Sequence, residues 1–353
     1  VFHLTGRQLL NDTALVAPDA TYLSFMGNIS GDLCERTNNL RRATRSLALN
    51  DTELTDITNR TSKIESAIVS QSYYSAASYC FGLNIKLRNL LYSNQTATDA
   101  QIDARSKQLR KDISRLEANA RGRELTTLTD IQALSIVLER LHDALQLLDR
   151  IKDEDSKRYL LAFAEERYYS AVVWARLFDV DGRSYTINKD VLKRSCIEKV
   201  QEARERHQYI TALLPSGADN IEKDIERAEG YANSGEYELC LIRASEAKAE
   251  SNTFVSSIGV EDKELGRLLD HKLEALNKVI SRTVQKRAFP VLGYSYYEYA
   301  RTLRTDEPTL ALLYSEYGLE LSNLDIYFEE ANAAPLTSAA TYSYHDIGLV
   351  LLD

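Results

Sequence analysis

Proline and glycine are scarce in this sequence. Its 353 residues include only 5 Pro and 14 Gly, and the prolines lie far apart, at positions 18, 215, 290, 308 and 335. Proline interrupts a helix because it lacks an amide hydrogen and its ring clashes with the preceding turn. The long spans between the prolines therefore favour helices over a chain broken by turns.

Sequence motifs for nucleotide binding and hydrolysis are also missing. The sequence contains no GxxxxGK[ST], GxGxxG, GxSxG or HExxH, and its five histidines are widely separated. His345-Asp346 looks like a metal phosphohydrolase signature, but few residues follow it that could supply further ligands. The segment 179–190 resembles a calcium loop only weakly, because Gly182 is its fourth residue and its twelfth is Asp190 rather than glutamate. We predict no catalytic residue, no metal site and no cofactor.

Basic charge and long apolar runs are lacking as well. The formal charge is -9 and the pI is about 5.3, which argues against a general nucleic-acid or anionic-membrane surface. No apolar run reaches the roughly 18 residues that a membrane helix needs. The chain starts at Val1 without a signal peptide, as expected of a processed or excised chain. Any membrane attachment is therefore expected through segments outside this sequence.

Cysteine is sparse, but its number permits disulfides. The four cysteines form no CxxC and lie far from the histidines, so a zinc site is not expected. The disulfide candidates are Cys34, Cys80, Cys196 and Cys240.

Sequons for N-glycosylation are frequent. Five occur, all before residue 95, at Asn11, Asn28, Asn50, Asn59 and Asn94, where about two or three are expected by chance. Chance clustering in a Thr-rich region is one explanation. An exported, glycosylated surface is the explanation that we favour, which places the protein outside the cell or on its surface.

The apolar pattern is clearest over residues 71–93. Its small and leucine residues recur at three- and four-residue intervals and so share one face of a helix. An earlier helix is expected over 21–49, and the polar segment 50–63 is expected to contain an exposed bend. An antiparallel return about residue 57 would bring Cys34 opposite Cys80, which makes these two plausible disulfide partners.

Two further apolar runs flank residues 121–129. Ile102, Leu109 and Leu116 follow a 3-4 spacing, and a second run extends from Ile131 to Leu148. Folding the runs back about residue 125 places them in register, so the sequence predicts an antiparallel coiled-coil hairpin. The consecutive acids Glu165-Glu166 and Glu329-Glu330 are expected to be ordinary helix-surface pairs.

A Tyr-x-x-small-x-x-x-small pattern starts at Tyr73, Tyr168 and Tyr237, and Tyr297 begins it again. Small residues let helices approach closely while each tyrosine covers the neighbouring turn, so the pattern indicates packing rather than a site. The segment 235–252 also resembles the turn and second helix of a tetratricopeptide-type unit, although no 34-residue period extends from it.

Together these patterns predict an all-α protein of antiparallel helical hairpins, a coiled-coil hairpin and TPR-like helix pairs. The expected divisions are a lead-in at 1–20, an N-terminal hairpin with sequons at 21–97, the coiled-coil hairpin at 98–152, a TPR-like bundle at 153–258, C-terminal helices at 259–330 and a tail at 331–353.

Three segments resemble a known family. QSYYSAASYCFG at 71–82, GEYELCLIRASEAKAESN at 235–252 and LALLYSEYGLELSNLDIYF at 310–328 are similar to the helical region after the protease domain of archaeal, exported or membrane-attached Lon-like serine proteases. The resemblance implies a protease domain before Val1 and a membrane helix after Asp353. It carries over no catalytic residue, because the family's Ser-Lys dyad belongs to the upstream domain.

Two functions are compatible with these observations. The first is a non-catalytic extracellular module of such a protease that binds polypeptide substrate, mediates self-association or anchors the enzyme. The second is a stand-alone surface or filament protein whose helical hairpins make subunit contacts, which would suit its 21 tyrosines. An enzyme with an unrecognised site is a third possibility that metal binding by Asp179, Asp181 and Asp190 would favour.

Overall fold

The described part of the chain is all α-helical. The computed structural model describes residues 20–94, 97–151, 156–213 and 219–329. These residues form twelve α-helices and, in place of any β-strand, one isolated bridge between Thr127 and Ser184. None of these helices is both long and apolar enough to cross a membrane. The predicted all-α class is confirmed.

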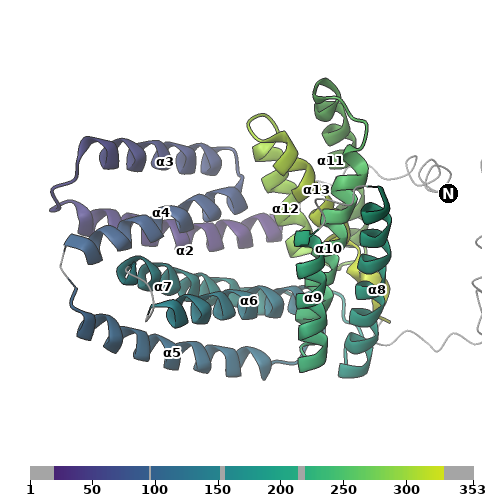
Figure 1. The fold of residues 1–353 in the computed structure, drawn as a ribbon, viewed down its shortest axis with the longest axis horizontal. Coiled ribbons are helices and arrows are strands. Elements are labelled where there is room, and N and C mark those ends of the chain that lie inside the picture. Colours follow the sequence, from purple (N-terminus) through teal and green to yellow (C-terminus); the bar gives the residue numbers. More distant parts are fainter. Residues whose placement is uncertain (1–19, 95–96, 152–155, 214–218, 330–353) are drawn as a thin grey trace, which may run out of the picture.

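The helices form two groups that run in different directions (Figure 1). The first group, here called the N-lobe, contains α2 (Ala20–Thr44), α3 (Asp51–Val69), α4 (Tyr73–Asn94), α5 (Asp99–Arg121), α6 (Leu128–Arg150) and α7 (Lys157–Trp174). The second group, the C-lobe, contains α8 (Lys189–Leu213), α9 (Asp219–Ser234), α10 (Tyr237–Ser257), α11 (Asp262–Gln285), α12 (Val291–Leu303) and α13 (Pro308–Ser322). Short 3-10 helices follow α7 and α13, at Ala175–Asp179 (η1) and Leu324–Tyr327 (η2).

Each lobe consists of two successive three-helix units in which the third helix is parallel to the first. In the unit α2–α4, Gly27 lies beside Tyr73 and Cys34 is bonded to Cys80, so residue numbers rise together along α2 and α4. Contacts between the first and third helices of the other three units have the same order. Asp99 and Arg105 of α5 contact Lys157 and Glu165 of α7, respectively. Cys196 and Glu202 of α8 contact Cys240 and Lys248 of α10, and Lys272 and Thr283 of α11 contact Glu316 and Ser322 of α13. The middle helix of each unit is the crossover that makes this parallel arrangement possible.

The segment predicted to contain an exposed bend, 50–63, instead begins helix α3. The Asn50 side chain accepts a hydrogen bond from the Glu53 amide at 2.9 Å, and the Glu53 side chain accepts one from the Asn50 amide at 3.0 Å. This capping box satisfies amides that the first turn of a helix leaves free. The bend prediction is wrong because the polar residues here are a helix start and an exposed helix face.

The pairing of Cys34 with Cys80 is present, although the antiparallel return that led to it is wrong. The two sulfurs are 2.05 Å apart and join the parallel helices α2 and α4. Cys196 and Cys240 join α8 and α10 in the same way, also with an S–S distance of 2.05 Å. Each disulfide therefore connects the first and third helices of one unit.

Helix α6 lies at the centre of the fold rather than in a separate coiled-coil hairpin. It follows α5 in the antiparallel direction (Figure 1), but it also contacts α7, α10 and α12. All of residues 127–138 are buried. The 3-4 spacing identified part of the α6 face toward α5, since one hydrophobic cluster contains Ile102, Leu109, Leu134, Leu138, Leu141 and Leu148, but Ile131 belongs to the larger core. The spacing could not show that the other faces of α6 are covered too.

Gln132 on α6 connects the two lobes. It is fully buried, its amide nitrogen donates to the Leu321 carbonyl at 2.9 Å, and its amide oxygen accepts from the Leu292 amide at 3.0 Å. The hydrophobic core around it is continuous, since one cluster includes Leu83 of the N-lobe and Leu241 of the C-lobe. The lobes therefore share a core.

The tyrosine pattern marks helix packing. Tyr73, Tyr168 and Tyr237 lie on α4, α7 and α10, the third helices of the first three units, whereas Tyr297 lies on α12. These tyrosines are half-buried. Ala76, Cys80, Cys240 and Ala244, the small residues of the first and third instances, are fully buried.

Candidate functional site

A groove of about 860 Å³ lies in the C-lobe between α9, α10 and the start of α13. Apolar side chains from all three helices line it, namely Ile221, Phe254, Pro308, Leu310 and Leu313. Phe254 is 38% exposed, which is high for an aromatic side chain in a helical bundle. The groove thus has an apolar surface that no other described element covers.

Glu250 gives the groove a distinct polar feature. Its carboxylate accepts a hydrogen bond from the Tyr317 hydroxyl at 2.6 Å, and no described residue forms an ion pair with it. Burial raises the pKa of the Glu250 carboxyl. A positive group brought into the groove would therefore find a carboxylate that is not yet neutralised.

Asp224 is a second acidic residue that lines the groove. Burial raises the pKa of the Asp224 carboxyl, and Arg227, whose guanidinium nitrogen is 3.5 Å away, opposes that shift. Lys223 and Glu307 also line the groove. An apolar surface with a few oriented polar groups is typical of a binding site. The described residues contain no group of three His, Cys, Asp or Glu side chains that could hold a metal ion.

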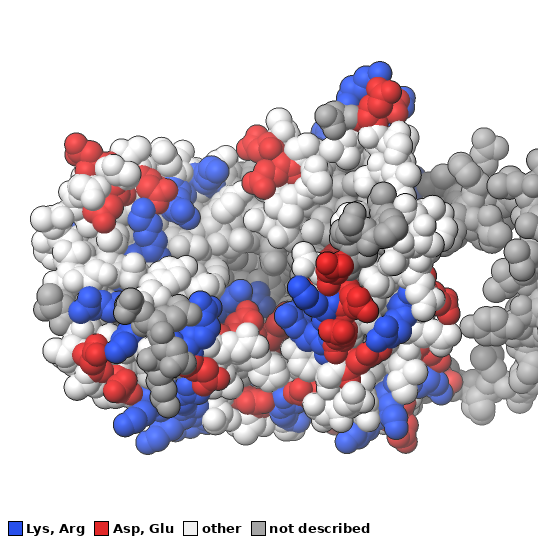
Figure 2. All heavy atoms as spheres, viewed as in Figure 1, with Lys and Arg blue, Asp and Glu red and all other residues white. Residues whose placement is uncertain are grey.

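The surface charge is mixed. Acidic and basic side chains are interspersed over most of the face drawn in Figure 2, which includes α9 and α10. Recognition by the groove would therefore depend on local groups such as Glu250 rather than on a broad field of one sign.

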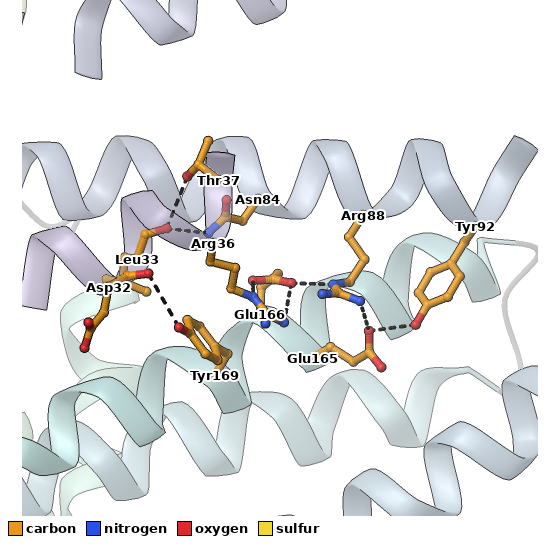
Figure 3. Close-up of polar contacts among 10 residues, drawn as sticks. All are labelled: Asp32, Leu33, Arg36, Thr37, Asn84, Arg88, Tyr92, Glu165, Glu166 and Tyr169. Carbon is orange, nitrogen blue, oxygen red and sulfur yellow. Dashed lines mark hydrogen bonds and ion pairs between the residues drawn. The ribbon is translucent and has the colours of Figure 1, made fainter. Parts of the chain in front are cut away.

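Glu165 and Glu166 are buried and form ion pairs with arginines, so the prediction that they are an ordinary helix-surface pair is wrong. They are 3% and 1% exposed. Glu166 accepts a bidentate pair of hydrogen bonds from Arg36 of α2, at 2.6 and 2.9 Å, and also bonds to Arg88 of α4 (Figure 3). Both acids therefore point toward the helices that cover α7.

Glu165 completes this buried network. It pairs with Arg88 at 3.0 Å and with Arg105 of α5, and it accepts a hydrogen bond from the Tyr92 hydroxyl at 2.7 Å. Burial and the nearby Glu165 carboxylate raise the pKa of Tyr92 to about 12. Every carboxylate oxygen of Glu165 and Glu166 has a partner, so the network ties α2, α4 and α5 to α7.

The sequence carried a signal for this network that periodicity alone did not reveal. Glu165 and Glu166 interrupt an otherwise largely apolar run that extends from Leu160 to Trp174. Two acids in such a run need buried cations, since an unpaired buried carboxylate is strongly unfavourable.

The calcium-like segment 179–190 serves as a structural connection between α7 and α8. The Tyr185 amide donates to the Thr126 carbonyl at 2.7 Å, and the Arg183 amide donates to the Arg287 carbonyl at 2.7 Å. A carboxylate oxygen of Asp179 lies 3.4 Å from a guanidinium nitrogen of Arg123. His345-Asp346 lies outside the described residues.

The candidate glycosylation residues lie on the N-lobe. Asn28, Asn50, Asn59 and Asn94 are exposed, and Asn11 lies outside the described residues. Asn50 caps α3 through its side-chain oxygen, so its amide nitrogen, the atom that carries a glycan, is not used by the cap. The amide nitrogen of Asn94 donates to the Leu90 carbonyl at 3.1 Å, so a glycan at this site would replace one of the donors of that group, whereas Asn28, Asn50 and Asn59 are exposed without such a bond among the described residues.

Comparison with known proteins gives no further guide to function. No protein-family model, curated protein or solved structure matches the chain.

Proposed function

We propose that this chain is a non-catalytic helical module that acts outside the cytoplasm and binds a polypeptide partner in the groove between α9, α10 and α13. The groove is the observation that carries this proposal. Its volume of about 860 Å³ accommodates several side chains. Its apolar residues and Glu250 favour a segment that presents apolar side chains beside a basic one.

The expected location rests on cysteines and sequons. The two disulfides are compatible with an oxidising compartment. The four exposed sequon asparagines favour the same location. Glycopeptide mapping of the native protein tests this part of the proposal, and four unmodified asparagines with free thiols would contradict it.

The resemblance to archaeal Lon-like proteases adds an expectation about the partner. If the module belongs to such an enzyme, the groove receives a substrate segment or a neighbouring part of the protease. The reading frame around Val1 and Asp353 decides this point. The alternative, a stand-alone surface or filament protein, requires self-association and predicts a molecular mass in solution that rises with protein concentration.

The groove is tested with two labelled peptides that differ in one group. Both contain leucines around a central residue, which is arginine in the first and its neutral isostere citrulline in the second. We expect saturable binding of the arginine peptide by fluorescence anisotropy, and binding that is about tenfold weaker for citrulline, because a charge-assisted hydrogen bond is lost.

A matched pair of variants locates the binding. Glu250→Gln keeps an acceptor for Tyr317 but removes the charge, so it should weaken binding of the arginine peptide about tenfold. Glu264→Gln on α11 removes an acidic side chain that is 44% exposed and should leave binding unchanged. Absence of binding to wild type, or equal binding to both variants, would overturn the proposal.

A further inference from the structure

A second cavity, of about 190 Å³, lies in the N-lobe between α2, α4, α6 and α7. Its walls include the aromatic side chains of Tyr74, Phe81 and Trp174, and two arginines, Arg140 and Arg167, also line it. No acidic side chain is among the described residues that line this cavity. Two guanidinium groups thus share a small space with three aromatic side chains.

Arg140 lacks a carboxylate partner among the described residues. Its Nε donates to the Ser170 hydroxyl at 3.0 Å and its Nη1 to the Ile136 carbonyl at 3.2 Å, and its guanidinium carbon lies 5.0 Å from the centre of the Trp174 ring. Burial, together with repulsion from Arg167, lowers the pKa of Arg140 to about 10. The contacts that described residues make with this cation therefore come from neutral groups, namely a hydroxyl, a backbone carbonyl and an indole ring.

Arg167 is only partly compensated. One of its terminal nitrogens lies 3.2 Å from the Asp143 carboxylate, and its guanidinium carbon is 5.0 Å from the centre of the Phe81 ring. Its buried Nε has no hydrogen-bond partner among the described residues. The two arginines and Asp143 therefore leave one uncompensated positive charge beside an unused donor.

The arginines at this cavity differ from those around Glu165 and Glu166 in their partners. There the arginines of α2, α4 and α5 meet buried carboxylates of the same chain. At Arg140 and Arg167 the described residues supply donors, positive charge and space, but no carboxylate that lines the cavity. Fork-shaped guanidinium donors match the two oxygens of a carboxylate.

We infer that the cavity lined by Arg140, Arg167 and Trp174 binds a small organic monocarboxylate, with its carboxylate on the arginines and its apolar part against the aromatic walls. One negative charge balances the uncompensated positive charge. The aromatic walls favour an alkyl substituent over the fully hydrated surface of an inorganic oxyanion. This site is separate from the groove of the C-lobe, so the two proposals fail or succeed independently.

Trp174 provides a direct test because it is the sole tryptophan of the chain. Its fluorescence is followed while the full chain, with disulfides intact, is titrated at constant ionic strength with isobutyrate, isobutyramide or inorganic phosphate. Isobutyramide has the same shape as isobutyrate without its charge. We expect a saturable change with isobutyrate and none with isobutyramide. Equal responses to both, no response to isobutyrate, or a response to phosphate alone would overturn the inference.

A variant pair places the effect in this cavity. Arg140→Met should weaken isobutyrate binding at least about tenfold, since it removes a charged donor. The variant should fold, because it replaces a cation without a carboxylate partner by an apolar side chain of similar length. Arg304→Met, which removes an exposed arginine that pairs with Asp270 at 2.6 Å, is the control and should bind isobutyrate like wild type. Unchanged binding in Arg140→Met would also overturn the inference.

Discussion

The side chain of Glu166 on α7 links two other helices, α2 and α4, to α7. It is 1% exposed and bonds to Arg36 of α2 and to Arg88 of α4. Removing one partner from a buried ion pair leaves the other charge uncompensated in a medium of low polarity. The effect of changing Glu166 should therefore exceed that of changing an exposed acid with one ion pair.

We expect Glu166→Gln to lower the free energy of unfolding by about 3–5 kcal/mol. The control is Asp149→Asn, because Asp149 pairs with Arg110 at 2.7 Å but is 70% exposed. That variant should change stability by less than about 1 kcal/mol. Urea denaturation at pH 7 measures both values. Similar losses in the two variants would show that the network contributes no more than a surface pair.

Glu298 on α12 should make stability depend on pH. Its side chain is buried and accepts a hydrogen bond from the Ser75 amide, in the first turn of α4, at 3.0 Å. Burial raises its pKa from 4.5 to about 7. The folded protein therefore holds a proton that the unfolded chain releases, and this contribution to stability is lost as the pH rises from about 4.5 through about 7.

Glu298→Gln should remove that loss. Glutamine keeps an oxygen for the Ser75 amide but does not titrate. We expect the free energy of unfolding of wild type to fall, relative to that of the variant, between pH 4.5 and 7.5, as measured by urea denaturation at several pH values. Parallel pH profiles of the two proteins would contradict the expectation.

At the scale of elements, α12 and α13 approach each other at glycine. A Cβ atom on Gly293 of α12 would overlap the Ser322 hydroxyl of α13, and one on Gly318 would lie 2.5 Å from a methyl carbon of Leu276. Rotation of the Ser322 hydroxyl would relieve only part of the overlap at Gly293, because the Ser322 Cβ and Cα would still lie 3.0 and 3.1 Å from the added carbon.

Gly293→Ala should therefore lower the free energy of unfolding by about 1–3 kcal/mol. Gly230→Ala is the matched control, because Gly230 also lies within a helix, α9, and a Cβ there would meet nothing within 4 Å. This control should gain up to about 1 kcal/mol from helix propensity. Chemical denaturation measures the two changes, which should have opposite signs.

Hydrophobic spacing predicts single helices well and their partners poorly. The helix expected over 71–93 is α4, Tyr73–Asn94, because one apolar face dominates that segment. Helix α3 was missed since it has few buried residues, namely Ile57, Ile64 and Ala67, and its start depends on the Asn50 capping box. Hydrophobic spacing also does not show that α2 and α4 are parallel. The apolar pattern on each helix is the same whether or not another helix lies between them in the sequence.

Hydrophobic spacing does not predict the groove between α9, α10 and α13. The groove is formed by residues on α9, α10 and α13, which lie far apart in the sequence, so no local motif identifies it. Glu250 on its own resembles any acidic residue of an amphipathic helix. Its distinguishing features, partial burial and the absence of an ion pair with any described residue, depend on how the third helices of two units meet.

At the scale of the whole molecule, the shared core predicts cooperative unfolding. Buried residues of both lobes belong to one hydrophobic cluster, and Gln132 hydrogen-bonds across the lobe boundary. The two disulfides span 46 and 44 residues of sequence. A link of that span stabilises a fold by about 4 kcal/mol when it restricts the unfolded chain.

We expect Cys34→Ala/Cys80→Ala and Cys196→Ala/Cys240→Ala each to lower the free energy of unfolding by about 4 kcal/mol. Because the core is continuous, calorimetry should show one transition at a lower temperature in each variant. Two resolved transitions, with only one displaced by a given pair of substitutions, would indicate that the lobes unfold separately.

The placement of both disulfides within single three-helix units also bears on how the chain matures. Cys34 and Cys80 belong to the first unit, and Cys196 and Cys240 belong to the third. A chain that enters an oxidising compartment from its N-terminus exposes Cys34 and Cys80 before either of the later cysteines arrives. The first pair can therefore oxidise before either thiol of the third unit competes for it, and Cys34 and Cys80 are then no longer free to pair with Cys196 or Cys240. For a chain exported in this direction, local closure of this kind would favour the pairings Cys34–Cys80 and Cys196–Cys240 over mixed ones and so reduce the need for slow disulfide reshuffling.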